Sequence, residues 1–145
     1  MNKISWCKRQ KKGIGLIDRK AHLSESYMKD AEESLDVCLD VKGKWKVISG
    51  YYACYNALYS ILMKCGIRCE IHDCTISLMS FFDFSKEELS FMESLKGKRI
   101  QTQYYLRDLS EDWKKVKSFV GRCKEILLGL NDNKINEIRR KIDEA

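Results

Sequence analysis

The residues of this chain best suited to chemistry are its two histidines and the arginines that could act with them. His72 follows Arg68 with three residues between them, and His22 stands apart near the N-terminus. An imidazole can accept a proton near pH 7, whereas a guanidinium keeps its charge and its planar fork of donors. Cleavage of RNA by its own 2′-hydroxyl needs such a base, a cation that stabilises the charged phosphorane, and no metal.

Each histidine also has a structural interpretation. His72 precedes Asp73, which can cap a helix over residues 74–82, so His72 can serve the loop and the helix start rather than catalysis. His22 stands at the start of the first expected helix, away from the expected site, and we interpret it as a solvated or capping residue.

The chain has seven cysteines, an odd number whose spacing matches no disulfide framework. Four potential zinc ligands fall within ten residues: Cys65, Cys69, His72 and Cys74. Structural zinc sites draw paired ligands from two separated turns, and four ligands so close would compete with the helix ends expected there. We therefore expect reduced thiols, several of them in the core, and neither a metal nor another cofactor.

Positive charge is concentrated at the N-terminus. Residues 1–20 hold seven lysines and arginines against Asp18, which accounts for the whole formal net charge of +6. A basic arm of residues 1–17 on a neutral body suits a phosphate backbone, with Lys11 and Lys12 as candidate nucleic-acid contacts. The alternative is a frayed, solvated tail.

The elements that must position these residues are helices. A chain of 145 residues can bury a full core, and zero proline with eight glycines favours long helices over a turn-rich β protein. No apolar run approaches the roughly 20 residues needed to cross a membrane, and the basic N-terminus lacks the apolar core of a signal peptide, so we expect a cytoplasmic protein.

Periodicity and capping residues predict an all-α, up-and-down bundle of four to five main helices with a short C-terminal helix. The expected helices cover residues 18–41, 44–65, 74–82, 86–96, 98–106, 110–130 and 134–145. Ser85 and Glu88 form a capping box, and Gly43, Gly66 and Gly97 are expected to end helices. The expected parts are the basic arm (1–17), the bundle (18–131) and a peripheral or partner-contacting C-terminal extension (132–145).

The segment 44–65 carries apolar residues almost all round, which is typical of a central helix. Its aromatic stripe is expected to form core or a dimer interface rather than a stacking platform for bases. The run from Gly50 to Leu62, followed by Gly66-Ile67, His72 and an Ile-Ser-Leu segment at 76–78, resembles the HEPN family, in particular its small stand-alone archaeal and bacterial members. The resemblance covers roughly residues 20–130.

The resemblance implies a helical bundle that pairs as a homodimer. Many HEPN domains are metal-independent ribonucleases whose motif is an arginine, four to six residues and a histidine, with two copies meeting across the dimer. Others bind RNA or nucleotides without cleaving them. Stand-alone members often accompany a minimal nucleotidyltransferase antitoxin, which in some pairs silences the HEPN toxin by adenylylating a tyrosine.

At the matching place this chain has Arg99, but Tyr104 stands where the family has histidine, and Tyr105 follows. A tyrosine with a pKa near 10 is a poor base at neutral pH. Arg99, with Lys98 beside it, could instead grip phosphate while Tyr104 or Tyr105 stacks on a base or accepts a modification. Alternatively, Arg99 pairs with an acidic neighbour and both tyrosines pack the bundle.

The leading interpretation is a HEPN-fold protein that binds nucleic acid or nucleotide, the toxin-side partner of a nucleotidyltransferase, with a degenerate ribonuclease motif. A second is an active endoribonuclease with His72 as base and Arg68 or Arg99 as cation. A third is a structural adaptor that docks a nucleotidyltransferase and touches no RNA.

Overall fold

The computed structural model describes residues 2–105 and 113–145, and of residues 101–105 only the helical backbone. The elements are α1 (Lys3–Arg9), β1 (Gly15–Leu16), α2 (Ala21–Asp40), α3 (Lys44–Cys65), β2 (Ile67–Arg68), α4 (His72–Ser77), the 3-10 turn η1 (Leu78–Phe81), α5 (Lys86–Tyr105), α6 (Trp113–Gly129) and α7 (Asp132–Glu144).

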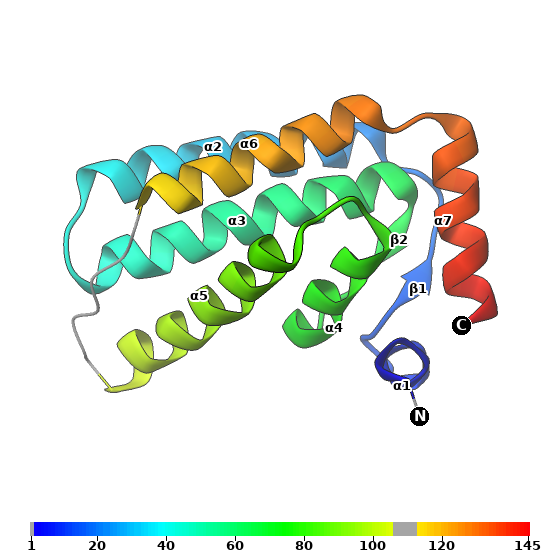
Figure 1. Cartoon of the computed structure of the whole chain (residues 1–145), viewed down its shortest axis with the longest axis horizontal. Helices are drawn as coiled ribbons and strands as arrows, with labels where there is room; N and C mark the ends of the chain where they lie inside the picture. Colours follow the sequence, from blue (N-terminus) through cyan, green and yellow to red (C-terminus); the bar gives the residue numbers. More distant parts are fainter. Residues whose placement is uncertain (1, 106–112) are drawn as a thin grey trace.

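Helices α2, α3, α5 and α6 run alternately up and down, and α3 lies in the middle of the other three (Figure 1). The predicted all-α up-and-down bundle is therefore confirmed. Close packing around α3 depends on small residues, since Gly50 of α3 lies against Cys38 of α2 and Val116 of α6. Because α3 has apolar residues almost all round, it can contact neighbours on several sides.

A short ribbon closes the end of the bundle where α3 stops. Gly66 takes the left-handed conformation, with φ 72°, and caps α3 as predicted. The chain then pairs β2 with β1 in antiparallel register, Gly15 opposite Arg68 and Leu16 opposite Ile67. Arg139 of α7 fastens this corner, because its Nη1 donates to the carbonyls of Ile17, Cys65 and Gly66 at 2.8, 2.9 and 2.9 Å.

Helix α5 begins with the predicted capping box but does not stop where predicted. The Glu88 amide donates to Ser85 Oγ at 3.1 Å, and the Ser85 amide donates to Glu88 Oε1 at 2.7 Å. The predicted break at Gly97 is wrong, since α5 continues to Tyr105. A glycine inside a helix costs only about 1 kcal/mol relative to alanine, which the packing of the flanking turns can offset.

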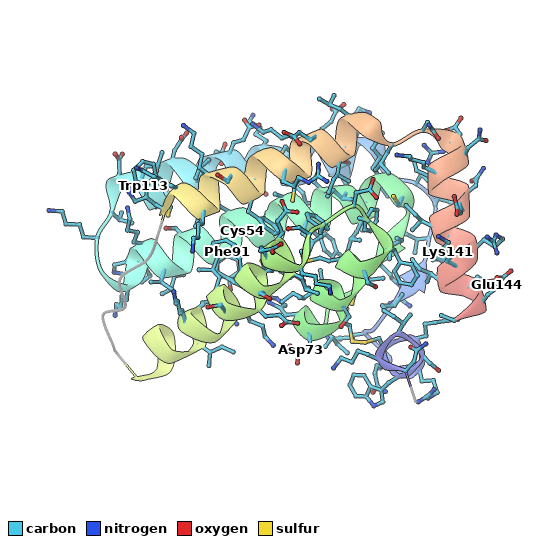
Figure 2. All side chains as sticks on the ribbon, viewed as in Figure 1. Cys54, Asp73, Phe91, Trp113, Lys141 and Glu144 are labelled. Atoms are coloured by element: carbon cyan, nitrogen blue, oxygen red, sulfur yellow. A yellow bond between two sulfur atoms is a disulfide. The ribbon has the colours of Figure 1, made fainter. Side chains whose placement is uncertain are left out.

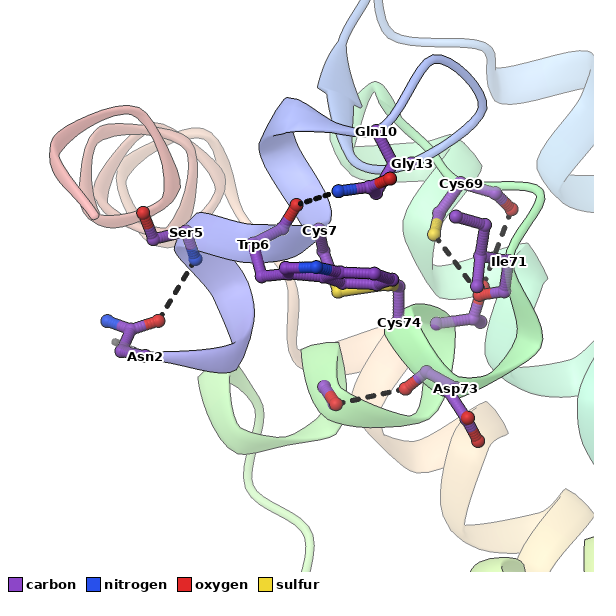
Figure 3. Close-up of a disulfide and its surroundings, with 12 residues drawn as sticks. Asn2, Ser5, Trp6, Cys7, Gln10, Gly13, Cys69, Ile71, Asp73 and Cys74 are labelled. Atoms are coloured by element: carbon purple, nitrogen blue, oxygen red, sulfur yellow. Dashed lines mark hydrogen bonds between the residues drawn. A yellow bond between two sulfur atoms is a disulfide. The ribbon is translucent and has the colours of Figure 1, made fainter.

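The N-terminal segment is folded, so its interpretation as a frayed tail is wrong. Ile4, Cys7 and Ile14 are buried in the same core as the bundle. A disulfide joins Cys7 of α1 to Cys74 of α4, with 5.8 Å between the Cα atoms (Figure 3). The expectation that every cysteine is a reduced thiol is corrected at this pair, whose residues are 67 positions apart in the chain.

The C-terminal segment is also part of the main core rather than a peripheral extension. Ile135, Ile138 and Ile142 of α7 are buried in that core. Lys8 Nζ of α1 donates to the carbonyls of Asp143 and Ala145 at 2.8 and 3.0 Å, so the first and last helices contact one another. Residues from all three predicted parts therefore share one hydrophobic core. Each helix in the described ranges is too short or too polar to cross a lipid bilayer.

Candidate functional site

Side chains from three helices meet at one place on the molecule. Tyr51 comes from α3, His72 from the start of α4, and Arg99 from α5. The αL glycine at position 66 and strand β2 turn the chain back after α3, which brings the first turn of α4 beside Tyr51 and Tyr55. Helix α5 runs alongside α3 (Figure 1), and Arg99 reaches the same tyrosines from that side.

His72 is half-buried and held by two tyrosines. Its Nδ1 lies 2.6 Å from Tyr51 Oη, and its ring stacks on Tyr55 with 4.1 Å between centroids and 17° between planes. Burial lowers the pKa of His72 below its usual 6.5, and the nearby charges of Arg99 and Lys96 lower it further. The imidazole is therefore mostly neutral at pH 7.

Arg99 lies over the aromatic rings of two adjacent tyrosines. Its guanidinium carbon is 4.7 Å from the Tyr51 ring centre and 5.8 Å from the Tyr52 ring centre. Its Nη1 is 3.4 Å from Tyr52 Oη, a long hydrogen bond. Cation–π contacts of this kind hold a guanidinium against the faces of the rings.

Tyr51 connects the base to the cation, because His72 is hydrogen-bonded to its hydroxyl and Arg99 lies over its ring. Burial raises the pKa of Tyr51 far above its ordinary value of 10, and the opposing effect of Arg99 is smaller. Tyr51 is thus a neutral phenol that can donate to, or accept from, His72 Nδ1. If it accepts, His72 Nε2 is free to take a proton, and if it donates, Nε2 carries a proton and is a donor.

The cluster thus has a neutral imidazole and a fixed guanidinium within reach of one phenol. An imidazole N–H and a guanidinium are both good phosphate donors. In the other tautomer, the imidazole can remove a proton from a nearby hydroxyl group. Phosphate binding and metal-independent cleavage of a phosphodiester are both within the chemistry of these side chains.

The structure pairs His72 with Arg99 rather than with Arg68. The exposed Arg68 lies on β2, where its Nη1 donates to the Gly13 carbonyl at 3.3 Å and its guanidinium packs against Gly15. These contacts tie the N-terminal segment to the ribbon, and the role of Arg68 as a catalytic cation stays a prediction. His22 is exposed on the first turn of α2, consistent with a solvated residue.

The other sequence candidates lie in three different places. Lys98 is half-buried on α5 next to Arg99, whereas Lys11 and Lys12 are exposed beyond the end of α1. Tyr104 and Tyr105 belong to the last turn of α5, and their side chains lie outside the described residues. The proposed roles of these tyrosines in stacking or modification therefore stay predictions.

The cysteine-rich stretch does not assemble the four potential zinc ligands. Cys74 is bonded to Cys7, and Cys69 Sγ donates to the Ile71 carbonyl at 3.4 Å. Burial raises the pKa of the Cys65 thiol to about 11, which disfavours the thiolate that metals bind. Within the described ranges, no three side chains of His, Cys, Asp or Glu are grouped so as to hold an ion.

Sequence reasoning missed Tyr51 and Tyr52 as members of the site. Tyr51 is fully buried and Tyr55 nearly so, as expected for core, yet Tyr52 on the same helix is 36% exposed. The signal was the pair of adjacent tyrosines, since neighbouring residues on a helix point about 100° apart and cannot both face the same core. One tyrosine can pack inward while the next stays at the surface beside α5.

No protein-family model matches this chain, and no curated protein is significantly similar to it. The functional interpretation therefore depends on the chain's own residues and their geometry.

Proposed function

We propose that this protein binds RNA or a nucleotide through Arg99 and His72, as a HEPN-type protein with a degenerate ribonuclease motif. The observation that carries the proposal is the convergence of Arg99 and His72 on Tyr51, which joins a permanent cation to an imidazole at a half-exposed surface. With Tyr51 as donor, His72 presents Nε2–H to a phosphate oxygen. Arg99 supplies the charge, and Tyr52 beside it offers an aromatic face to a base.

Binding is tested with a fluorescently labelled 12-nucleotide single-stranded RNA and anisotropy measurements on the full chain. Replacing Arg99 with Gln removes the charge while keeping length, and we expect at least a tenfold loss of affinity. His72→Asn should cause a smaller loss. The matched control is His22→Asn, which changes the exposed histidine of α2 and should bind as the unaltered protein does. Equal affinity of all four proteins would refute the proposal.

A second candidate is a metal-independent endoribonuclease with His72 as base and Arg99 as cation. The specific observation in its favour is that the neutral imidazole and the guanidinium contact the same tyrosine. The imidazole would take the proton of the 2′-hydroxyl, the 2′-oxygen would attack phosphorus, and the bond to the 5′-oxygen would break. The products are a 2′,3′-cyclic phosphate and, after a proton is supplied to the leaving oxygen, a 5′-hydroxyl.

Cleavage in the presence of a chelator distinguishes the two candidates. We expect bound but intact RNA. Rapid cleavage to cyclic-phosphate ends, abolished by His72→Ala or Arg99→Ala in a protein that still folds and unaffected by His22→Asn, would replace the binding proposal with the enzymatic one.

The resemblance extends the proposal to partners. In this interpretation two copies form a homodimer in the cytoplasm, and the dimer is the toxin side of a pair with a minimal nucleotidyltransferase that modifies Tyr104 or Tyr105. Co-expression with such a transferase, followed by mass measurement, tests the pairing through a mass gain of one adenylyl group that Tyr104→Phe or Tyr105→Phe removes. Co-purification with the transferase but no binding to any RNA at low salt would favour the adaptor interpretation.

A further inference from the structure

Helix α3 is central, yet one strip of it lies at the surface. The strip begins at Trp45, which is 59% exposed, and includes Tyr52, which is 36% exposed. Two half-buried residues complete the α3 strip, Ser49 between the rings and Asn56 beyond Tyr52. Steps of three or four residues place all four on one face of the helix. The opposite face points inward, where Cys54 is buried in the middle of the molecule (Figure 2).

The residue types of the α3 strip are suited to nucleotides. Trp45 and Tyr52 provide rings on which bases can stack, and Asn56 carries an amide that can hydrogen-bond to a base edge. Ser49 folds back on the helix, because its Oγ donates to the Trp45 carbonyl at 2.6 Å. The strip therefore places no long side chain between the two rings. The buried ring of Tyr51 belongs to the core as expected, so stacking falls to the exposed rings.

The α3 strip is continuous with the residues proposed to bind RNA. Tyr52 lies beside Arg99, whose guanidinium carbon is 5.8 Å from its ring centre. Trp45 is two helical turns earlier, about 10 Å along the axis, near the end of the bundle where α2 turns into α3 (Figure 1). Stacked nucleotides rise about 3.4 Å each, so a single base reaches one ring, whereas a strand of several nucleotides can reach both.

The indole of Trp45 is restrained by its neighbour. Lys44 lies over the ring, with 5.2 Å from Nζ to the ring centre, which lowers the cost of ordering the indole when a base stacks on it. The charges at this corner are mixed, since Lys42 and Asp40 are both exposed. Stacking needs no excess of cations, because every base presents a π face to an aromatic ring.

We propose that Trp45 and Tyr52 are stacking residues for two bases of one single-stranded RNA, which runs along α3 from the His72 cluster towards the turn between α2 and α3. The inference rests on the proposed function and extends it from one nucleotide to a strand. A single strand fits because its unpaired bases can turn outward onto the rings. Stacking tolerates any base, so we expect little sequence preference.

The test compares Trp45→Ala with Trp6→Ala in anisotropy titrations of the 12-nucleotide RNA. Trp6 is the matched control, because it is 40% exposed and has Lys3 Nζ at 5.1 Å from its ring centre, but it belongs to α1. Losing one stacked base weakens binding by about fivefold or more. We expect this loss for Trp45→Ala and no change for Trp6→Ala.

Two further variants separate stacking from apolar contact. Trp45→Tyr keeps a ring and should retain most of the affinity, whereas Trp45→Leu keeps only apolar bulk and should bind as weakly as Trp45→Ala. Full affinity of the leucine variant would refute stacking. Because Trp45 is exposed, each variant should keep the circular dichroism spectrum of the unaltered protein, and this spectrum is measured before the titrations.

Two other ligands test whether bases and a strand are required. A 12-mer of the sugar–phosphate chain without bases, and adenosine monophosphate, should each bind the unaltered protein and Trp45→Ala equally. A loss with the abasic 12-mer as large as that with RNA would refute stacking. An equal loss with adenosine monophosphate would identify a site for one nucleotide and overturn the strand.

The remaining outcomes separate this inference from the proposed function. If Arg99→Gln weakens binding and Trp45→Ala does not, the strand along α3 is refuted and the proposed function survives. If Trp45→Ala weakens binding while Arg99→Gln and His72→Asn have no effect, the proposed function fails and the stacking surface stands. If Trp45→Ala dissociates a dimer in sedimentation experiments and leaves RNA affinity unchanged, the strip is an interface between copies, and the inference is overturned.

Discussion

At the scale of a single residue, the surroundings of His72 determine its protonation. Its pKa in the folded protein is depressed by burial and by Arg99 and Lys96, whereas in the unfolded chain it returns to about 6.5. The unfolded state therefore binds a proton more readily, and the free energy of unfolding falls as the pH drops below about 6.5. Above that pH the contribution of His72 is constant.

We predict that Arg99→Gln raises the pKa of His72 and reduces this pH dependence, because a neighbouring positive charge is removed. Titration of the imidazole resonances by NMR measures the shift directly. The chain has two histidines, so the His22→Asn variant identifies which imidazole resonances belong to His72. An unchanged His72 pKa in the variant would contradict the closeness of the two side chains.

We also predict that Tyr51→Phe lowers the free energy of unfolding by about 1 kcal/mol, the net value of one hydrogen bond. The change removes the hydroxyl that is bonded to His72 Nδ1 and keeps the ring under Arg99. Tyr52→Phe is the matched control, since the contact of its hydroxyl with Arg99 is long, at 3.4 Å, and the residue is partly exposed. Denaturant unfolding should show a clear loss for the first variant and little for the second.

Residue types alone indicated which side chains could do chemistry but not which of them meet. His72 and Arg99 were candidates from the start, but their common contact with Tyr51 spans 21 residues on one side and 48 on the other. That contact depends on how α4 and α5 lie against α3, and no local pattern encodes it. The sequence left Arg68 and Arg99 as alternative cations beside His72, and the structure places Arg99 on the tyrosine that contacts His72.

Among the elements, the continuity of α5 through Gly97 leads to a prediction about stability. Among the described residues, a Cβ at Gly97 would meet no atom within 4 Å, and the position is helical. Gly97→Ala should therefore raise the free energy of unfolding by about 0.5–1 kcal/mol, chiefly by restricting the unfolded chain. The midpoint of urea unfolding measures the change.

Gly66→Ala provides the opposite case. Gly66 has φ 72°, and a Cβ there would collide with the Ile17 carbonyl and the Arg139 guanidinium. This variant should be destabilised, since a non-glycine residue is strained at this positive φ and its Cβ has no room. A loss of stability at Gly97 as large as that at Gly66 would mean that α5 does break where the sequence suggested.

The elements were largely predictable because helix periodicity and capping are local. The span of α3, the capping box of α5 and the glycine cap after α3 all follow from residues within a few positions of each other. Helix α1 and the ribbon were missed, because α1 buries only Ile4 and Cys7 of its seven residues and each strand has two residues. Such short elements form only because the rest of the fold lies against them.

For the whole molecule, the disulfide gives the clearest prediction. Closing a loop between residues 67 positions apart restricts the unfolded chain by an amount worth about 4 kcal/mol in the loop-entropy model. Dithiothreitol should therefore lower the melting temperature of the unaltered protein and leave that of a Cys7→Ser, Cys74→Ser double variant unchanged. Thiol counting in denaturant should find five reactive cysteines without reductant, and seven would contradict the bond.

The bundle as a whole was predictable from the order and length of its helices. The contact between the first and last helices of the chain was not. The basic N-terminus has the composition of a solvated arm, and α7 offers three isoleucines on an otherwise polar helix. Their burial follows from contacts between segments more than a hundred residues apart, such as Lys8 with the Asp143 carbonyl.

Arg139 has a practical consequence for anyone who wishes to shorten this protein. Its guanidinium serves three backbone oxygens at the corner where α3, the ribbon and α7 meet. A version ending at residue 131 would resemble a trimmed bundle, but it would remove the Arg139 donor from all three oxygens and expose the core residues that Ile135, Ile138 and Ile142 cover. We therefore expect such a fragment to be less stable than the intact chain, so the site is better dissected by single substitutions in the full-length protein.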